Sequence, residues 1–194
     1  MRKKQECSNR ALIYIKKSIL APVESLERVF VALGSNIAPR GKRLAEARDM
    51  LRRVSLGGWQ ESSIYETSPV GPEGQGLFLN QVVSFWYGRG PRRLLHYLKG
   101  AELFLGRRPR GHWERREIDL DLLYYGEQIC DGRPGGPVVP HPLATSRGFV
   151  MVPLAEIAPD MRDPLVGNTA GKILEELRTR KVETEFRKVE VDDE

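Results

Sequence analysis

The order in which strand-like and helix-like apolar patterns follow one another is the strongest constraint on the fold. Two stretches repeat apolar residues at helical spacing, residues 41–55 and 91–105. Four stretches are typical of strands, at residues 29–33, 59–68, 77–88 and 116–126. The resulting β-α-β-β-α-β order is that of an α+β, ferredoxin-like domain. We therefore expect an antiparallel sheet with helices on one face and an open face suited to binding.

The same patterns indicate a single folded domain. The 194 residues suffice for one domain with its own core. Residues 1–28 are basic at first and lack a strong apolar face, so we expect a disordered or loosely attached N-terminal extension before a domain at 29–180. We expect Pro153 to begin a one-turn helix, a further helix around residues 173–177, and a C-terminal tail at 181–194.

Composition restricts the kind of partner. The net charge of +5 favours an anion, whether nucleic acid, a membrane surface or a phosphorylated small molecule. Cys7 and Cys130 have neither a pairing pattern nor metal-ligand spacing, which suits free thiols in a reducing compartment. No apolar run approaches the ~20 residues of a membrane span or the ~7–15 of a signal peptide. We expect a cytoplasmic protein with no membrane partner.

Two aspartates stand two residues apart in the last expected strand, REIDLDLLYYG. Residues i and i+2 of a strand share one face, so Asp119 and Asp121 lie roughly 7 Å apart at their Cα atoms. Like charges this close repel unless a positive group lies between them. The pair is either part of a solvated sheet face or a site for a hard cation, most simply Mg²⁺. If it is a cation site, replacing either residue by Ala is expected to leave the metal-free protein at least as stable.

An arginine-rich loop precedes this strand. Planar guanidinium groups bind phosphate oxygens bidentately, although runs of charge are often only solvated loops. Arginines beside a carboxylate pair match the parts of nucleoside triphosphate–Mg²⁺ chemistry. The chain has no P-loop motif, so side chains and metal have to hold the phosphates. The arginines are Arg107, Arg108, Arg110, Arg115 and Arg116, and His141 with Arg147 could reach one further phosphate.

A second function stays open at this point. The segment RGFVMV at residues 147–152 begins like an RNA-binding motif carried by ferredoxin-like folds. Val150 and Met151 break the match, and an RNA-binding module leaves the aspartate pair unexplained.

Four blocks carry a resemblance to a known family. The segments VFVALGSN, YETSPVGPEGQGLFLNQVV, GRRPRGHWERREIDLDLLYYG and VPHPLATSRGFVMVPLAEIAPD resemble, in order and spacing, the 6-hydroxymethyl-7,8-dihydropterin pyrophosphokinases of folate biosynthesis. The resemblance covers about residues 29–160. It implies a transferase that moves pyrophosphate from ATP to the pterin hydroxymethyl group, in line and without a covalent intermediate, giving AMP and the pterin diphosphate. It also implies two Mg²⁺ ions, small-molecule partners rather than nucleic acid, and a monomer. A nucleotide-binding scaffold that has lost activity is the alternative.

The resemblance also assigns roles to individual residues. The metal ligands it implies are Asp119 and Asp121, and the catalytic residues are these two with Arg107 and Arg116. The ATP contacts are Glu102, Arg116, His141 and Arg147. The pterin contacts are Thr67, Val70, Phe78, Asn80, Trp113 and Phe149, with the two phenylalanines on either side of the ring.

The chain departs from the family pattern in the arginine-rich loop. Glu114 and Arg115 replace the usual Gly-Pro, and His112 stands where an arginine is common. The loop is one residue short, so either Arg108 or Arg110 can be its second arginine.

Overall fold

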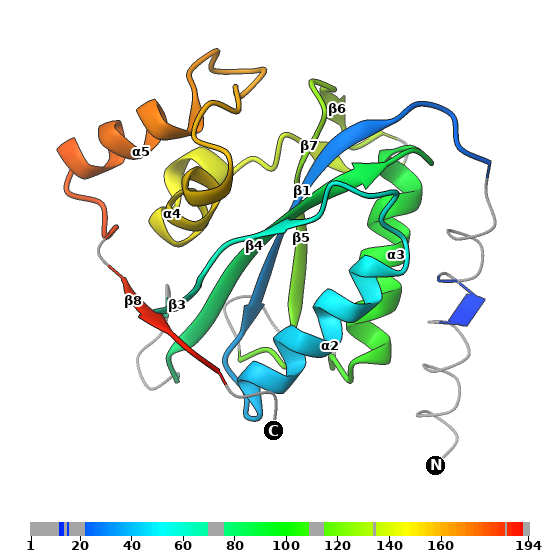
Figure 1. Cartoon of the computed structure of the whole chain (residues 1–194), viewed down its shortest axis with the longest axis horizontal. Helices are drawn as coiled ribbons and strands as arrows, with labels where there is room; N and C mark the ends of the chain where they lie inside the picture. Colours follow the sequence, from blue (N-terminus) through cyan, green and yellow to red (C-terminus); the bar gives the residue numbers. More distant parts are fainter. Residues whose placement is uncertain are drawn as a thin grey trace.

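A six-stranded antiparallel sheet forms the centre of the computed structural model, which describes residues 12, 13, 15, 22–69, 76–108, 115–133, 135–184 and 186–191. The strand order is β5-β1-β4-β3-β8, with β2 also paired to β4 (Figure 1). The strands are β1 (Glu27–Ser35), β2 (Gln60–Glu61), β3 (Ile64–Thr67), β4 (Phe78–Tyr87), β5 (Asp119–Tyr125) and β8 (Arg187–Val189). A small second sheet pairs β6 (Cys130–Asp131) with β7 (Val138–Val139).

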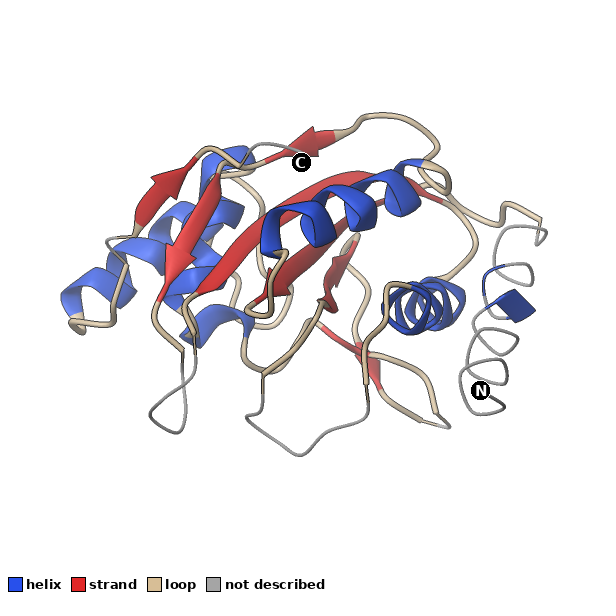
Figure 2. Cartoon of the chain, turned by 90° about the horizontal axis from the view of Figure 1, so that it is seen from below, coloured by secondary structure: helices blue, strands red, loops and turns tan. Residues whose placement is uncertain are grey.

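Helices cover both faces of the large sheet (Figures 1 and 2). Alternation along β1 explains this, because Val29 and Val31 pack in the cluster with α2 and α3, whereas Phe30 packs with α4 and α5. The β-α-β-β-α-β order is therefore confirmed, but the expectation of helices on one face only is wrong. The helices are α2 (Arg40–Arg52), α3 (Pro91–Phe104), α4 (Gly148–Ile157) and α5 (Ala170–Thr179), with a 3₁₀ turn η1 (Ala144–Ser146) before α4.

Helix α4 differs most from the sequence-based prediction. Pro153, expected to begin a one-turn helix, lies inside α4, which starts five residues earlier at Gly148. The chain leaving α5 passes so close to this start that a Cβ on Gly148 would lie 1.8 Å from the Glu183 carbonyl oxygen. Only glycine allows this approach.

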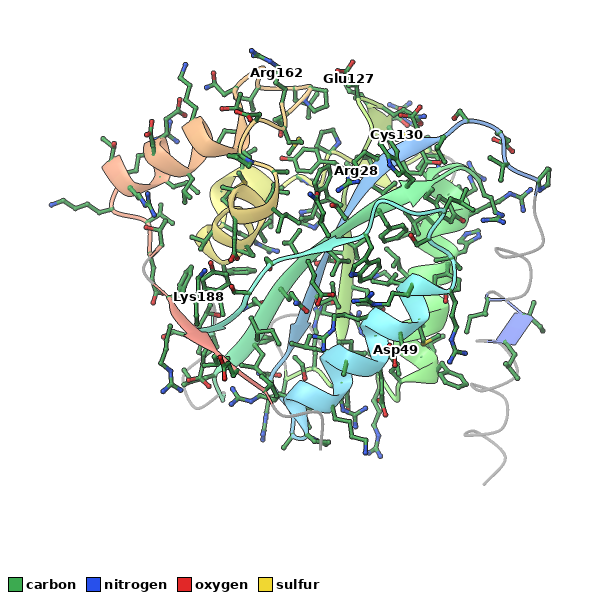
Figure 3. All side chains as sticks on the ribbon, in the orientation of Figure 1. Arg28, Asp49, Glu127, Cys130, Arg162 and Lys188 are labelled. Carbon is green, nitrogen blue, oxygen red and sulfur yellow. The ribbon has the colours of Figure 1, made fainter. Side chains whose placement is uncertain are left out.

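Residues 187–189, which we expected in a tail, form the edge strand β8. Arg187 Nη2 lies 2.6 Å from Glu66 Oε2 on β3, and Lys188 Nζ lies 2.9 Å from Glu156 Oε1 on α4 (Figure 3, where Lys188 is labelled). A three-residue charged strand has no periodic signal, so only its tertiary contacts reveal it.

The first strand also begins earlier than predicted. Glu27 and Arg28 pair with Tyr87 and Trp86 on β4, and the Glu24 N–H donates to the Gly88 carbonyl at 2.6 Å. Most of the predicted extension at 1–28 lies outside the described residues, and the domain boundaries stay predictions. None of the helices in the described ranges is both long and apolar enough to cross a membrane.

Candidate active site

A cavity of about 390 Å³ lies on the sheet face that carries α4. Its walls come from β1, β3, β4, β5 and the segment from residue 141 to the start of α4. The cavity brings together predicted site residues that are up to 82 positions apart in the sequence, counting from Thr67 to Phe149. These lining residues are Thr67, Phe78, Asn80, Arg116, Asp119, Asp121, His141, Arg147 and Phe149. Val70, Arg110 and Trp113 lie outside the described residues.

The floor of the cavity is the end of β1. Gly34 pairs with Asn80 on β4 and with Asp119 on β5, so it lies directly between them. A Cβ added to Gly34 would lie 3.2 Å from Asn80 Oδ1. The missing side chain therefore leaves an open path between the Asn80 end of the cavity and the aspartate pair.

One end of the cavity suits a flat polar ring. Phe78 on β4 and Phe149 on α4 both line it, and the Arg147 guanidinium lies 5.5 Å from the Phe149 ring centroid. Asn80 Nδ2 donates to Thr67 Oγ1 at 2.7 Å, and both residues are buried. Aromatic faces with a fixed amide can stack on a heterocycle and hydrogen-bond its edge.

The other end carries the aspartate pair among basic side chains. Arg107 Nη1 lies 2.7 Å from Asp119 Oδ1, and Arg116 Nη1 lies 2.6 Å from Asp119 Oδ2. Lys99 Nζ lies 3.8 Å from Asp121 Oδ1. Although burial opposes it, the charges of Arg107 and Arg116 hold the pKa of Asp119 below its usual value. Both carboxylate oxygens of Asp119 are thus ion-paired, and Asp121 lies within ion-pair distance of Lys99.

Glu102 lies beneath this end and not among the residues that line the cavity. It is 2% exposed, and its Oε1 accepts from the Leu120 N–H at 2.8 Å and from Lys99 Nζ at 2.8 Å. Arg107 Nη1 pairs with the same oxygen. Burial raises the pKa of Glu102, while Lys99 and Arg107 oppose the shift. Its position supports the backbone of β5 and the Arg107 side chain.

His141 is held by the backbone on both sides. The backbone N–H of His141 donates to the Leu123 carbonyl at 2.9 Å, and its ring Nδ1 accepts from the Leu143 backbone N–H at 3.2 Å. A neutral imidazole in this arrangement carries its proton on Nε2. Burial lowers the pKa of His141, with Arg147 in the same direction and Asp121 opposed. His141 can therefore donate a hydrogen bond to an anion without being charged.

Sequence reasoning missed two residues at this site. Asn36 Oδ1 accepts from the Arg116 N–H at 2.7 Å, and its Nδ2 donates to the Gly76 carbonyl at 3.5 Å, so Asn36 links the two segments beside the cavity. The sequence feature that could have indicated Asn36 is a polar residue directly after a buried strand. Lys99 stands three residues before Glu102 on α3, and that spacing places both on one helix face.

The two carboxylates of the cavity fit a cation that binds together with a nucleotide. Among the described residues, no group of three or more His, Cys, Asp or Glu side chains could form a metal site. Mg²⁺ is usually bound by one or two carboxylates, with waters and substrate phosphates completing its shell. Asp119 and Asp121, both lining the cavity, match that pattern.

A cavity that joins a carboxylate pair to arginines holds the parts that enzymes of phosphoryl transfer use. A family profile described as 7,8-dihydro-6-hydroxymethylpterin-pyrophosphokinase (HPPK) matches residues 30–159. The chain belongs to this family, and so to the ATP-dependent pyrophosphokinases.

Relatives that carry the name of this activity match most of the chain. The 2-amino-4-hydroxy-6-hydroxymethyldihydropteridine pyrophosphokinase of Pseudomonas aeruginosa is 38% identical over 140 residues, which are 72% of this chain and 85% of that protein. The Bacillus subtilis protein of the same name is 39% identical over 129 residues, 66% of this chain and 76% of its own length. A mitochondrial folate synthesis bifunctional protein of Arabidopsis thaliana is 34% identical over 77% of this chain, but the match spans only 27% of that protein.

Solved structures agree on the fold. Wild-type HPPK-DHPS of Plasmodium falciparum, crystallised with pteroate, superposes with a TM-score of 0.64 at 14% identity over 83% of this chain. The match spans 44% of that larger protein, so the chain corresponds to less than half of it. The ferredoxin-like α+β prediction is confirmed.

Proposed function

We propose that the protein transfers pyrophosphate from ATP to the hydroxymethyl group of 6-hydroxymethyl-7,8-dihydropterin, giving AMP and the pterin diphosphate for folate biosynthesis. The observation that carries the proposal is a single cavity with a stacking slot at one end and a carboxylate pair with arginines at the other. The reaction needs the two substrates, one at each end of the cavity, close enough for a bond to form between them. The names of the P. aeruginosa and B. subtilis relatives support the same substrate.

The pterin occupies the aromatic end in this proposal. Phe78 and Phe149 stack on the ring, and the Thr67–Asn80 pair recognises its polar edge. Val70 and Trp113 contribute walls by resemblance to the family. The path over Gly34 then directs the hydroxymethyl group toward the aspartates.

The nucleotide phosphates occupy the basic end. Arg116, His141 and Arg147 line that part of the cavity and supply donors to phosphate oxygens. Arg107 is a catalytic residue, because its guanidinium already lies beside the Asp119 carboxylate. Glu102, predicted as an ATP contact, acts here through Arg107 and Leu120 because it is buried.

Asp119 and Asp121 would hold Mg²⁺, and the resemblance to the family implies two ions. Their charge would neutralise phosphate oxygens. The hydroxymethyl oxygen attacks the β-phosphorus in line and loses its proton to solvent, the bond between the β-phosphorus and the α-phosphate oxygen breaks, and AMP leaves with that oxygen. Arg107 and Arg116 stabilise the charge that develops on the transferred group. The protein forms no covalent intermediate.

Counting AMP tests this function. With ATP, Mg²⁺ and the pterin, we expect one AMP for each pterin consumed, and none when the pterin is omitted. Asp121→Asn should lower turnover at least ~100-fold, the scale for losing one electrostatic element of a site. Lys172→Met, an exposed change on α5, is the matched control and should have no effect. Pterin-independent hydrolysis, ADP as product, or binding of RNA without turnover would contradict the proposal.

A further inference from the structure

Strand β5, which carries the aspartate pair, is an edge strand with β1 as its one neighbour in the large sheet. No strand within the described ranges pairs with its outer backbone groups. At Leu120 two side chains of α3 take that place: the Leu120 N–H donates to Glu102 Oε1 at 2.8 Å, and Lys99 Nζ donates to the Leu120 carbonyl at 3.1 Å. Lys99 and Glu102 also pair with each other at 2.8 Å.

Leu120 is the residue between Asp119 and Asp121. Its side chain points into the core and is 0% exposed, while the two aspartates point to the cavity. The peptide units on either side of Leu120 set the directions of the Cα–Cβ bonds of both aspartates. A backbone held at this residue therefore holds the separation of the two carboxylates.

We propose that Lys99 and Glu102 are positioning residues, which clamp the Leu120 backbone and thereby set the two carboxylates at the spacing that a divalent cation needs. The inference rests on the proposed assignment of the cation to Asp119 and Asp121. The i,i+3 spacing on α3 lets both side chains reach the same residue of β5.

Lys99 has a second contact that the test has to separate from the clamp. Its Nζ lies 3.8 Å from Asp121 Oδ1, and a positive charge there competes with a cation. Simple removal of Lys99 changes the clamp and this charge together, with opposite effects on cation affinity.

A comparison of Lys99→Met with Lys99→Gln removes the ambiguity. Both variants are neutral, but the Gln amide can still donate to the Leu120 carbonyl, whereas Met cannot. Binding of Mn²⁺ is measured by calorimetry with a non-hydrolysable ATP analogue present. We expect Lys99→Met to bind Mn²⁺ at least about fivefold more weakly than Lys99→Gln, the scale of one net hydrogen bond.

Three controls show whether the effect is positional. Lys99→Arg should restore Mn²⁺ affinity, because it keeps a charged donor. Pterin affinity should be the same in Lys99→Met and Lys99→Gln. The exposed change Lys172→Met should leave every quantity at the wild-type value.

Equal Mn²⁺ affinity of Lys99→Met and Lys99→Gln overturns the clamp. If the wild type itself binds no Mn²⁺ with the ATP analogue, the cation assignment fails, and the clamp is judged in the ligand-free protein by amide hydrogen exchange. There the Leu120 N–H should exchange at least about fivefold faster in Lys99→Met than in Lys99→Gln. Equal exchange rates would reject the clamp independently of the proposed function.

Discussion

Replacing Asp119 by Asn should destabilise the ligand-free protein, although it removes one of two neighbouring like charges. If the pair is a cation site, the sequence led us to expect relief of repulsion, so that Ala at either position would leave the metal-free protein at least as stable. The structure reverses that sign for Asp119, because both of its carboxylate oxygens are ion-paired, at 2.7 Å to Arg107 and 2.6 Å to Arg116.

The attraction of Asp119 to its arginines and its repulsion by Asp121 can be compared at one dielectric constant. At an effective dielectric constant of about 20, an opposite charge at ~4 Å contributes about 4 kcal/mol, and Asp119 has two such neighbours. A like charge at roughly 7 Å, the Cα separation expected for Asp121, costs about 2 kcal/mol. Attraction therefore exceeds repulsion before desolvation is counted.

The net loss is smaller than these gross terms. Breaking a fully buried ion pair costs about 3–5 kcal/mol. The Asp119 side chain is 22% exposed and that of Arg116 is 29% exposed, so we expect about 2 kcal/mol. For a chain of this size that lowers the melting temperature by about 4–8 °C.

The assay is thermal and urea unfolding in EDTA without nucleotide. Asp121→Asn is the matched control, because its ion-pair partner among the described residues, Lys99, is as far as 3.8 Å away, and the loss of stability should be under about 1 kcal/mol. An Asp119→Asn protein as stable as wild type would show that repulsion within the pair dominates and that the arginines contribute nothing net.

Three further predictions follow from other parts of the structure. Phe149→Ala should weaken pterin binding about fivefold in calorimetry, because it removes stacking worth on the order of 1 kcal/mol, and should leave the affinity for the ATP analogue unchanged. Equal losses for both ligands would make Phe149 a core residue. In steady-state assays Arg107→Ala should lower kcat far more than it raises the KM for ATP, because the contact of Arg107 with the transferred group strengthens in the transition state. A rise in KM alone would limit Arg107 to phosphate binding. Although burial opposes it, Arg187 and Arg40 hold the pKa of Glu66 below its usual value. Because the pKa of Glu66 is lower in the folded than in the unfolded protein, its ion pairs stabilise the fold above the unfolded pKa of about 4.3, and this stability is lost as the pH falls through the folded pKa. In urea unfolding, Glu66→Gln should therefore be about 1 kcal/mol less stable than wild type at pH 7, and the difference should shrink between about pH 5 and 3. A difference that is constant with pH would refute the ion-pair origin.

Local patterns predicted the frame of the site. Period-two alternation placed Asp119 and Asp121 on one face of a strand, and the structure shows both lining the cavity. The order of the patterns predicted where the strands of the sheet up to β5 lie in the chain, although the segment expected as one strand at 59–68 forms two, β2 and β3.

Contacts between distant segments were beyond reach of the sequence. The edge strand β8 and the start of α4 depend on where the chain passes after α5, which no local pattern encodes. The pairing of Arg107 with Asp119, and the contacts of Lys99 and Glu102 with Leu120, require the end of α3 to lie along β5. Spacing within one segment cannot show such proximity.

A crystal structure with the pterin, a non-hydrolysable ATP analogue and Mn²⁺ tests the central claim most directly, because the anomalous signal locates the cations. The account predicts Mn²⁺ bound by Asp119 and Asp121 and the pterin ring between Phe78 and Phe149, with the phosphates between these two ends. A structure in which the nucleotide binds outside this cavity, or in which the aspartates bind no Mn²⁺ and Asp119 still pairs with Arg107, would contradict it.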